Sequence, residues 1–389
     1  MKILLVGGGS GGHITPVLAV ASELKNIDPK ITTIYVGQKG DHLNDVIKKD
    51  TSIDKNYTVM AGKYRRYNGG LLSQLLDVPT LLKNARDVIY LGIGLIQSSI
   101  LIAKLRPDVV FSRGSFVAVP VSLAAKIFRV PYVTHDSDPV PSLSNRMLSK
   151  WAAYHLTALD EENYPYPREN TINTGIPLSN KFVQVDEKLK NKYRKELDIP
   201  EKSKVLLVTG GGLGAEEINQ AMSEIEGHLL EQFRDLHIIN IVGQKNLEKY
   251  QDFYTELKRD FNERLKVIGF TDQVYLYSGA ADLIIARAGA TNLAEFAVQN
   301  KACIIIPGSH LTGGHQIENA KILAEKEAIV PIYSKGMKLD SNKLAQKIVD
   351  LLKDSKGRGV LEKNISMFAK PNAGNTIAKL LIKIGENEA

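Results

Sequence analysis

Five of the six residues from Gly7 to Gly12 are glycines, and this run lies between an apolar segment at residues 3–6 and an apolar-periodic segment at residues 14–25. The pattern predicts a buried strand, a tight turn and a helix. Glycines allow positive φ angles and let a ligand approach the main chain, while the start of a helix presents unpaired N–H groups and a partial positive charge. The sequence therefore predicts a site for an anion, a phosphate or a developing oxyanion, at this turn.

His13 follows at the entrance of the predicted helix, where a neutral imidazole can accept a proton or donate a hydrogen bond. A histidine that only caps the turn is the alternative, and both remain open. The glycines of residues 7–12 also match the dinucleotide fingerprint Gly-x-Gly-x-x-Gly. A nicotinamide site is disfavoured, because the strand expected at 33–37 is followed by Gln38 and Lys39 and not by an acidic residue that would hold a ribose diol.

Length and composition indicate a protein of two domains. The chain has 389 residues, of which 43% are hydrophobic and 24% charged, as in soluble globular proteins. Its formal net charge of +7 suggests an anionic partner. A nucleic acid is not expected, because the basic residues are spread through predicted helices and no ribonucleoprotein motif or zinc spacing occurs.

The single cysteine and the start of the chain point to a cytoplasmic protein. Cys303 lies in an apolar run and is interpreted as an inert core residue, so no disulfide framework is expected. Residues 1–6 run directly into a strand and lack the pattern of a secretory signal peptide.

Short β-branched runs alternate with helix-length segments, which predicts parallel sheets covered by helices on both faces. Strands are expected in the first half near residues 2–6, 32–37, 108–111, 131–134 and 154–157, and in the second half near residues 204–208, 238–242, 267–268, 283–286, 303–306 and 329–331. The second half also opens with a glycine loop, residues 210–214. We therefore predict an α/β fold of two doubly wound domains that face one another across a cleft.

A polar run with two prolines, residues 161–174, is interpreted as the linker between the domains. The boundaries that follow are residues 1–168 for the N-terminal domain and 169–368 for the C-terminal domain. A final segment, residues 369–389, completes the chain.

The region between the second and third predicted strands is unusual. Residues 63–70 are basic and aromatic, and residues 88–103 are apolar except for an interruption at residues 97–99. This apolar run falls short of a membrane span, and a buried helix is the favoured interpretation. An interfacial helix is the alternative, because basic residues that would suit anionic lipid headgroups surround it: Arg65, Arg66, Lys83, Arg86, Lys104 and Arg106.

Two further turns in the first half carry polar residues at predicted strand ends. The run Ser112-Arg113-Gly114-Ser115 is a candidate for a second backbone cradle. The run His135-Asp136-Ser137-Asp138 has two carboxylates at a spacing that can bind a divalent cation. A turn rich in Asp and Ser is common without a metal, and this is the favoured interpretation.

The second half contains a similar turn at residues 286–295. Gly289, Ala290 and Thr291 follow a strand and start a helix, which is the geometry of a diphosphate site. Glu295 lies one turn into that helix, where its carboxylate could accept two hydrogen bonds from a ribose diol. A solvated helix glutamate is the alternative.

Three stretches taken in order, residues 7–16, 286–295 and 311–320, resemble the motifs of the bacterial family that adds N-acetylglucosamine to lipid I. The resemblance extends from Lys2 to about Ile384. It implies a GT-B architecture, inversion at the anomeric carbon, no metal or other cofactor, and peripheral attachment of the N-terminal domain to the cytoplasmic face of the membrane. It also implies UDP-N-acetylglucosamine as donor, lipid I as acceptor, and a last helix that returns to the first domain.

The resemblance further assigns residues to the two substrates. Independently of the family, we expect His13 to act in catalysis as base or orienter, with Asp138 as a competitor peculiar to this chain. The acceptor diphosphate would be held by Gly9, Gly12, His13, Gly114 and Ser115. The donor would contact Ser10, Gly11, Gly12, Asp138, Ser179, Gly212, Phe270, Thr271, Ala290, Thr291, Asn292, Glu295, His315 and Gln316. Among these, Phe270 and Thr271 would meet the uracil, Glu295 the ribose, and Gln316 the sugar hydroxyls.

The chain departs from the family pattern at four positions. Asp138 stands where the family has an asparagine, Ser179 where it has an arginine, Gly212 where it has a serine, and His315 where it has a glutamine. These departures affect donor contacts, so alternatives stay open: a related transferase with another lipid acceptor such as diacylglycerol, a nucleotide-sugar-binding protein without turnover, and, further off, an oxidoreductase.

Overall fold

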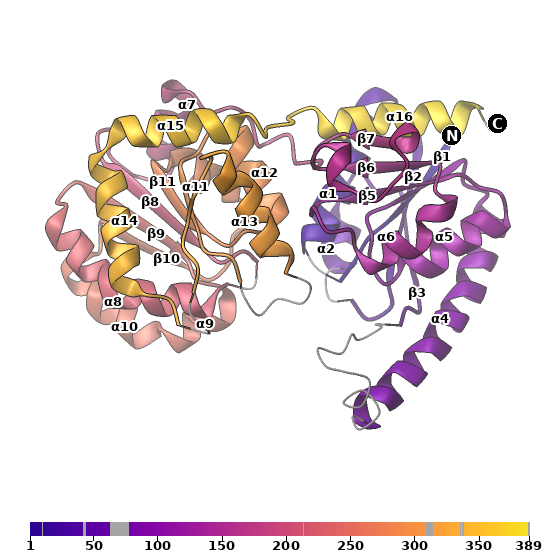
Figure 1. Ribbon diagram of the computed structural model, residues 1–389, viewed down its shortest axis with the longest axis horizontal. Coiled ribbons are helices and arrows are strands. Elements are labelled where there is room, and N and C mark those ends of the chain that lie inside the picture. The colour runs from indigo at the N-terminus through magenta and orange to yellow at the C-terminus, as the bar shows by residue number, and fades with distance from the viewer. Residues whose placement is uncertain are drawn as a thin grey trace. The chain divides into compact units, whose positions relative to one another are not determined.

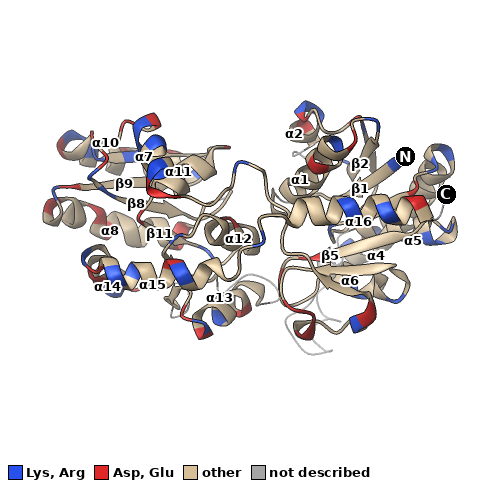
Figure 2. Ribbon diagram, turned by 90° about the horizontal axis from the view of Figure 1, so that it is seen from above, with Lys and Arg blue, Asp and Glu red and all other residues tan. Residues whose placement is uncertain are grey.

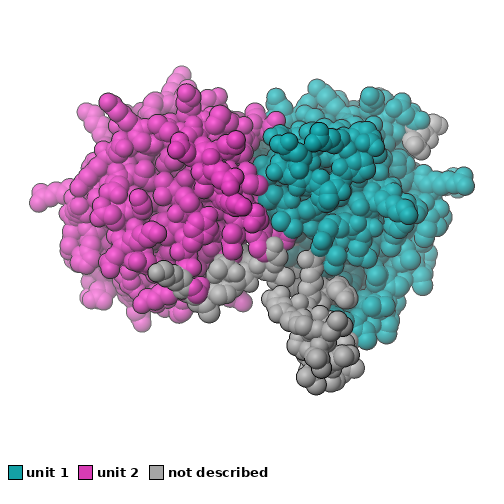
Figure 3. Space-filling model, viewed as in Figure 1, with its two compact units in different colours: residues 1–179, 372–389 teal, residues 180–371 magenta. Residues whose placement is uncertain are grey.

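The chain folds into two compact units in the computed structural model (Figure 1). The structure describes residues 1–9, 11–41, 44–62, 78–212, 214–308, 314–334, 336 and 338–387, with the backbone alone at residues 78, 79, 81 and 82. Basic and acidic residues are both scattered over the helices of the two units (Figure 2). Unit 1 comprises Met1–Ser179 and Asn372–Ala389, and unit 2 comprises Asn180–Pro371 (Figure 3).

Unit 1 is built on a seven-stranded parallel sheet with the order β3-β2-β1-β4-β5-β6-β7. Residues 3–6 of β1 are completely buried because helices cover both faces, which explains their uninterrupted apolar sequence. The strand order reverses between β1 and β4, the position where open α/β sheets bind ligands. The strands are β1 (Lys2–Val6), β2 (Thr32–Gln38), β3 (Lys55–Val59), β4 (Val109–Ser112), β5 (Tyr132–Asp136), β6 (Tyr154–Thr157) and β7 (Thr171–Asn173).

The last helix of the chain belongs to unit 1. Ile377, Ala378 and Leu381 of this helix, α16, are buried in the same cluster as residues of α1, and Asn375 Nδ2 donates to Glu23 at 3.0 Å. The helices of the unit are α1 (Gly11–Ile27), α2 (Asn44–Lys49), α4 (Val78–Leu105), α5 (Ala118–Ile127), α6 (Leu143–Leu148) and α16 (Ala373–Asn387), with 3-10 turns η1 (Ser149–Trp151), η2 (Glu161–Asn163) and η3 (Arg168–Asn170).

Unit 2 repeats the design with a six-stranded parallel sheet in the order β10-β9-β8-β11-β12-β13. Its strands are β8 (Lys204–Thr209), β9 (Leu236–Ile241), β10 (Leu265–Ile268), β11 (Leu283–Ala286), β12 (Cys303–Ile305) and β13 (Val330–Pro331). Its helices are α7 (Glu187–Glu196), α8 (Glu216–Gln232), α9 (Gln244–Lys249), α10 (Gln251–Phe261), α11 (Val274–Ala280), α12 (Ala290–Val298), α13 (His315–Glu325), α14 (Ser341–Lys353) and α15 (Ser355–Ser366).

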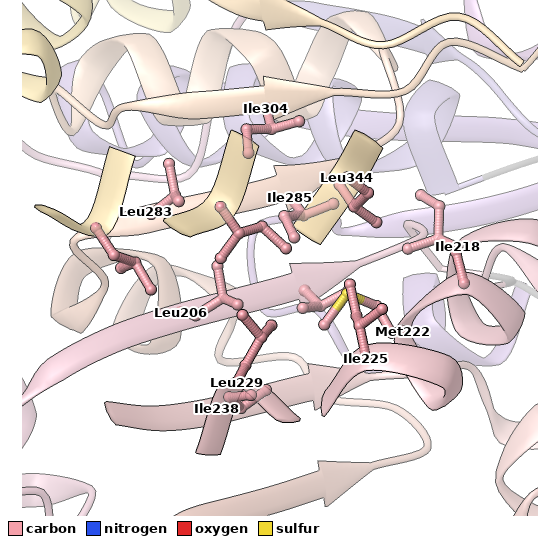
Figure 4. Packing of buried hydrophobic residues seen from close by; sticks show 14 of the residues in the cluster. Leu206, Ile218, Met222, Ile225, Leu229, Ile238, Leu283, Ile285, Ile304 and Leu344 are labelled. Carbon is pink, nitrogen blue, oxygen red and sulfur yellow. The ribbon is translucent and has the colours of Figure 1, made fainter. Parts of the chain in front are cut away.

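Alternate residues of each central strand in unit 2 supply two separate cores. Leu206 of β8 packs in one cluster with Met222 of α8 and Leu344 of α14 (Figure 4), whereas its neighbour Leu207 packs in the other cluster on the opposite face. Cys303 of β12 is fully buried in that second cluster, as predicted for a core residue. The predicted fold class, two doubly wound parallel α/β sheets, is confirmed.

The interpretation of residues 161–174 as a linker is wrong. These residues contain β7, which pairs with β6, and Tyr166 is only 8% exposed because its ring stacks on His155 at 4.0 Å. The first unit therefore continues to Ser179. Neither β7 nor β3 was expected, because the sequences of these two edge strands, residues 171–173 and 55–59, are mostly polar and lack a continuous apolar run.

The favoured interpretation of residues 88–103 as a buried helix is also wrong. They lie within α4, a continuous helix of 28 residues whose segment Lys83–Leu105 is long and apolar enough to cross a membrane, with only 22% of its most apolar window buried. One face of α4 packs on α5, while a stripe on another face is 37–64% exposed. This stripe, the α4 stripe, consists of Ile89, Ile93, Ile96 and Ile100. Residues 63–70, with Arg65 and Arg66, lie outside the described residues.

Candidate active site

The glycine turn after β1 already holds a carboxylate oxygen. Gly8 and Gly9 have φ angles of +143° and +85°, and the Gly9 N–H donates to Asp41 Oδ2 at 2.7 Å. Tyr35, buried beneath the turn, donates its hydroxyl to the Gly7 carbonyl at 2.9 Å. The Gly9 N–H thus binds an anionic oxygen of the chain itself, and binding of a ligand anion at this turn stays a prediction. Ser10 lies outside the part of the chain that the structure describes.

His13 enters the site from the first turn of α1. Its Nδ1 atom lies 3.3 Å from the Arg113 carbonyl oxygen. Burial, reinforced by the charge of Arg113, lowers the pKa of His13 to about 4, so the imidazole is neutral at physiological pH. When Nδ1 carries the proton and donates to that carbonyl, Nε2 is left with a lone pair that can accept a proton.

The two carboxylates after β5 have different surroundings. Asp136 is buried and accepts hydrogen bonds from the Ser142 N–H at 3.1 Å and from the Tyr166 hydroxyl at 2.7 Å, while burial raises its pKa. Asp138 is half-buried, and its charge acts on both His13 and Arg113. Within the described ranges, no three His, Cys, Asp or Glu side chains are grouped as metal ligands. Asp136 therefore anchors the loop through its contacts to Ser142 and Tyr166, whereas a catalytic role of Asp138 stays a prediction.

Gly114 and Ser115 follow β4, next to β1 in the sheet. Gly114 has a φ of +68°, and a Cβ atom there would lie 2.9 Å from both Asn145 Nδ2 and Ser142 Oγ. A side chain is therefore excluded at Gly114, which is buried against Asn145 and Ser142. Ser115 Oγ is buried and has no hydrogen-bond partner among the described residues, so it can still donate to one.

Arg113 is a residue of this site that the sequence interpretation missed. Its side chain is 3% exposed, and its Nη2 atom donates to the Gly12 carbonyl at 3.4 Å and to Ser137 Oγ. Burial lowers its pKa to about 10, and the charges of Asp138 and Asp136 oppose that shift. An arginine two positions after the fully apolar strand residues 109–111 was the signal that could have identified it.

In unit 2, the glycine loop after β8 lies beside the start of α12. Gly211 and Gly214 have φ angles of +81° and +76°, and a Cβ atom on Gly211 would lie 3.9 Å from Asn292 Nδ2. A Cβ atom on Gly214 would lie 2.1 Å from the Val242 carbonyl oxygen, so only glycine fits there. Gly212, in contrast, faces open space.

Helix α12 begins at Ala290 without a side-chain cap and without an acidic residue in its first turn. The N–H groups of Ala290, Thr291 and Asn292 are therefore available to an anion at the carboxyl end of β11. Since β8 and β11 are neighbours at the switch point of this sheet, the glycine loop and α12 contribute to the same edge.

Glu295 lies one turn further along α12. Its side chain is partly buried and has no hydrogen-bond or ion-pair partner among the described residues. Burial raises its pKa to about 8. A carboxyl group held without a partner next to a helix start is suited to bind the hydroxyl groups of a ligand.

The loop after β10 presents an aromatic ring to solvent. Phe270 is 63% exposed, and Thr271 Oγ1 accepts a hydrogen bond from the Gln273 N–H at 3.0 Å. An exposed ring at a strand end can stack on a flat base. These residues lie at the carboxyl edge of the same sheet as α12.

The remaining residues predicted to contact the sugar donor differ in their hydrogen bonds and in their burial. Gln316 Oε1 accepts a hydrogen bond from the Gly308 N–H at 2.9 Å, and His315 Nδ1 is buried without a partner among the described residues. Both start α13 after β12, whereas residues 309–313 of the third motif lie outside the description. Ser179 is exposed at the end of the first segment of unit 1.

The structure thus gathers the predicted residues into two groups. In unit 1, the loops after β1, β4 and β5 bring together Gly9, Gly11, Gly12, His13, Gly114, Ser115 and Asp138. In unit 2, the carboxyl edge carries Gly212, Phe270, Thr271, Ala290, Thr291, Asn292, Glu295, His315 and Gln316.

Comparisons with known proteins cover the whole chain. Residues 3–157 match the glycosyltransferase family 28 N-terminal domain, and residues 205–377 match the glycosyltransferase family 28 C-terminal domain. The UDP-N-acetylglucosamine--N-acetylmuramyl-(pentapeptide) pyrophosphoryl-undecaprenol N-acetylglucosamine transferase of Natranaerobius thermophilus is 31% identical over 383 residues, which are 98% of this chain and 99% of that protein.

Two solved structures share the fold. Acinetobacter baumannii MurG superposes with a TM-score of 0.70 at 23% identity and covers 98% of this chain and 99% of its own. The UDP-GlcNAc 2-epimerase of Neisseria meningitidis, solved with UDP-GlcNAc, superposes with a TM-score of 0.66 at 16% identity and covers 98% of this chain and 100% of its own.

Proposed function

The chain belongs to glycosyltransferase family 28, and we propose that it transfers N-acetylglucosamine from UDP-N-acetylglucosamine to the 4-hydroxyl of lipid I, which forms lipid II for peptidoglycan synthesis, with inversion at the anomeric carbon. The observation that carries this proposal is the full-length similarity to relatives named for that reaction, at 31% identity over 98% of the chain. The chain is accordingly a glycosyltransferase.

In this proposal, unit 1 binds the acceptor. The amide of Gly12 and the turn at Gly114 and Ser115 hold the lipid-linked diphosphate, and the Gly9 amide joins them when the diphosphate displaces the Asp41 carboxylate. The acceptor hydroxyl attacks in line, and neutral His13 accepts its proton at Nε2, with Asp138 as the competing base. The low pKa of His13, about 4, keeps this lone pair available at neutral pH.

Unit 2 binds the donor. The first-turn amides of α12 stabilise the charge that develops on the departing UDP, and preorganised donors of this kind supply roughly 3–4 kcal/mol of transition-state stabilisation. Glu295 accepts hydrogen bonds from the ribose, Phe270 and Thr271 contact the uracil, and Gln316 contacts the sugar. Three predicted contacts to the sugar donor differ from the family pattern: Ser179 stands in place of an arginine, Gly212 of a serine and His315 of a glutamine.

The α4 stripe gives unit 1 a surface that suits a peripheral membrane enzyme. Its isoleucines are exposed, and Lys83, Arg86 and Lys104 of the same helix are also exposed. An apolar stripe with cationic neighbours fits the acyl and headgroup layers of an anionic membrane. We propose that unit 1 binds the cytoplasmic face of the membrane through α4, where a lipid-linked acceptor is found.

Incubation of the purified protein with labelled UDP-N-acetylglucosamine and either lipid I or diacylglycerol tests the reaction. We expect a labelled product with lipid I alone. A product with diacylglycerol alone would replace lipid I as the acceptor, and binding of the donor without transfer to either lipid would indicate a nucleotide-sugar-binding protein.

Replacement of His13 tests the assignment of the base. His13→Ala is expected to lower kcat by roughly 10²–10⁴-fold, the usual contribution of a general base, while UDP binding by unit 2 stays intact. Near-normal turnover in this variant would show that His13 is not the general base. Asp138→Asn would then be expected to cause the loss of kcat instead.

A further inference from the structure

Arg113 joins the three loops that carry the candidate acceptor site. Its Nη2 atom donates to the Gly12 carbonyl at 3.4 Å and to Ser137 Oγ, and its own carbonyl oxygen lies 3.3 Å from His13 Nδ1. These contacts connect the first turn of α1, the turn after β4 and the loop after β5. A guanidinium is a rigid planar fork, so it fixes the direction of both partners in a way that a lysine ammonium does not.

The charge of Arg113 acts on the same groups. The side chain is 3% exposed and its Nε atom is buried without a partner among the described residues, so its charge is poorly screened. Arg113 adds to the burial that lowers the pKa of His13, and Asp138 opposes that lowering. The ionisable groups coupled to Arg113 are Asp138, Asp136 and Tyr164, together with His13 and His135.

We propose that Arg113 is a positioning residue for the transfer reaction. Its guanidinium links the helix start that carries His13 to the loop that carries Asp138, and it thereby fixes the positions of these two candidate bases relative to one another. The inference rests on the proposed function, and it adds a residue that neither the glycine motifs nor the family pattern identified. Asp138, a carboxylate at a position where the family has an amide, is close enough to Arg113 for its charge to raise the pKa of the guanidinium.

The electrostatic link is tested in the free protein by following the His13 ring protons through an NMR pH titration. Arg113→Gln removes the charge but keeps hydrogen-bond donors, and we expect the pKa of His13 to rise above that of the wild type. Asp138→Asn is expected to lower it, and the double variant to return it toward the wild-type value. Arg259→Gln, at an exposed position on α10 of unit 2, is the control and should leave it unchanged.

Steady-state kinetics test the positioning role. We expect Arg113→Gln to lower kcat on the order of 10²-fold, the usual effect of a small misplacement of reacting groups, with KM for UDP-N-acetylglucosamine changed less than about 2-fold. Arg113→Lys keeps the positive charge but lacks the planar guanidinium, so we expect an intermediate loss of kcat, on the order of 10-fold. Ser137→Ala removes only one of the two hydrogen-bond acceptors of the guanidinium and should lower kcat by a smaller factor than Arg113→Gln does.

The outcomes separate this inference from the proposed function. A wild-type kcat in Arg113→Gln and Ser137→Ala, or an unmoved His13 pKa in folded Arg113→Gln, overturns the role of Arg113 while the transferase assignment stands. If the wild-type protein transfers no sugar, the proposed function fails, and the titration still decides whether Arg113 couples His13 to Asp138. If Arg113→Gln does not fold, Arg113→Lys and Ser137→Ala decide the question.

Discussion

At the scale of single residues, Glu295 shows how burial prepares a side chain for a ligand. A carboxyl group with a pKa of about 8 and no partner among the described residues is held neutral at pH 7, and it gains most from a ligand that offers hydroxyl donors. The ionised form is the stronger acceptor, so ligand binding favours loss of the proton.

Replacement of Glu295 by glutamine tests this role. We expect Kd for UDP to rise about 10-fold, the effect of one lost hydrogen bond to a charged group, and Kd for 2′,3′-dideoxy-UDP to change little. UDP affinity of the wild type should rise as pH increases toward about 8, because deprotonation creates the better acceptor, and this dependence should disappear in the variant. Isothermal titration calorimetry measures both effects, with Glu325→Gln, exposed on α13, as control. Equal losses for both nucleotides would contradict a ribose contact.

At the scale of elements, α4 approaches the segment after β3 closely at Gly94. A Cβ atom on Gly94 would lie 2.0 Å from the Met60 carbonyl oxygen, whereas a Cβ atom on Gly92 would meet nothing within 4 Å. Gln97, one turn further on, accepts a hydrogen bond from the Met60 N–H at 2.8 Å. The close approach of the helix to the segment after β3 therefore depends on Gly94 and not on Gly92.

The two glycines form a matched pair of variants. We expect Gly94→Ala to lower the free energy of unfolding of unit 1 by about 1–3 kcal/mol through overpacking, and Gly92→Ala to raise it by up to about 1 kcal/mol through helix propensity. Trp151 is the single tryptophan of the chain and lies in unit 1, so its fluorescence follows this unfolding. Equal effects of the two substitutions would exclude the packing argument.

The α4 stripe provides the second prediction at this scale. The double variant Ile89→Glu/Ile96→Glu is expected to lower binding to phosphatidylglycerol vesicles at least about 10-fold, because each buried isoleucine contributes about 1.5–3 kcal/mol. The midpoint of thermal unfolding should stay unchanged, since both side chains are more than 60% exposed. Co-sedimentation measures binding, and Val360→Glu, at a 52% exposed position on α15, is the control. Undiminished binding would mean that α4 does not contact the membrane.

At the scale of the whole molecule, burial shifts the pKa values of histidines in unit 1 and of glutamates in unit 2. In unit 1, burial is the main cause that lowers the pKa values of His13 and His155 to about 4 and of His135 to about 3. In unit 2, burial raises the pKa of Glu226 to about 7 and that of Glu295 to about 8. Both units therefore favour the neutral form of the side chains that they enclose.

The buried histidines of unit 1 and the buried glutamates of unit 2 contribute to stability with opposite pH dependence, and Asp136 in unit 1 and Lys301 in unit 2 oppose these contributions. Below pH 6.5 the unfolded histidines bind protons that the folded ones do not, so unit 1 loses stability as pH falls from 6.5 to about 4, by up to about 1.4 kcal/mol per pH unit for each histidine. Folded Glu226 and Glu295 keep protons that the unfolded ones lose above pH 4.5, so unit 2 loses stability as pH rises from 4.5 to about 8.

Calorimetry of the whole chain, with Trp151 fluorescence to identify the unit 1 transition, measures both trends. His155→Gln should remove the contribution of one histidine to the loss of stability of unit 1 as pH falls. Glu226→Gln should reduce the loss of stability of unit 2 as pH rises. A unit 1 transition that does not move between pH 6.5 and 4.5 would show that the buried histidines titrate normally.

Much of the fold and part of the candidate site follow from local sequence. Central strands such as β1 read as continuous apolar runs because both faces of the sheet are covered, and turns such as Gly8-Gly9 need glycine because of their φ angles. The start of α12 and the position of Glu295 could be predicted for the same reason, since both depend on a few adjacent residues. The edge strands β3 and β7 escaped prediction because their mostly polar sequences carry no such pattern.

What the sequence determined by itself was the class of fold, the two glycine turns and the family to which the chain belongs. Only the tertiary structure decided which side of α4 meets solvent, which ionisable groups are neutral, and what Arg113 does. Arg113 and its partner Gly12 lie 101 residues apart in the chain, and His13 owes its low pKa to burial by distant segments. Glycine requirements and apolar runs act over neighbouring residues, whereas burial and charge act through space, and chain folding alone brings those groups together.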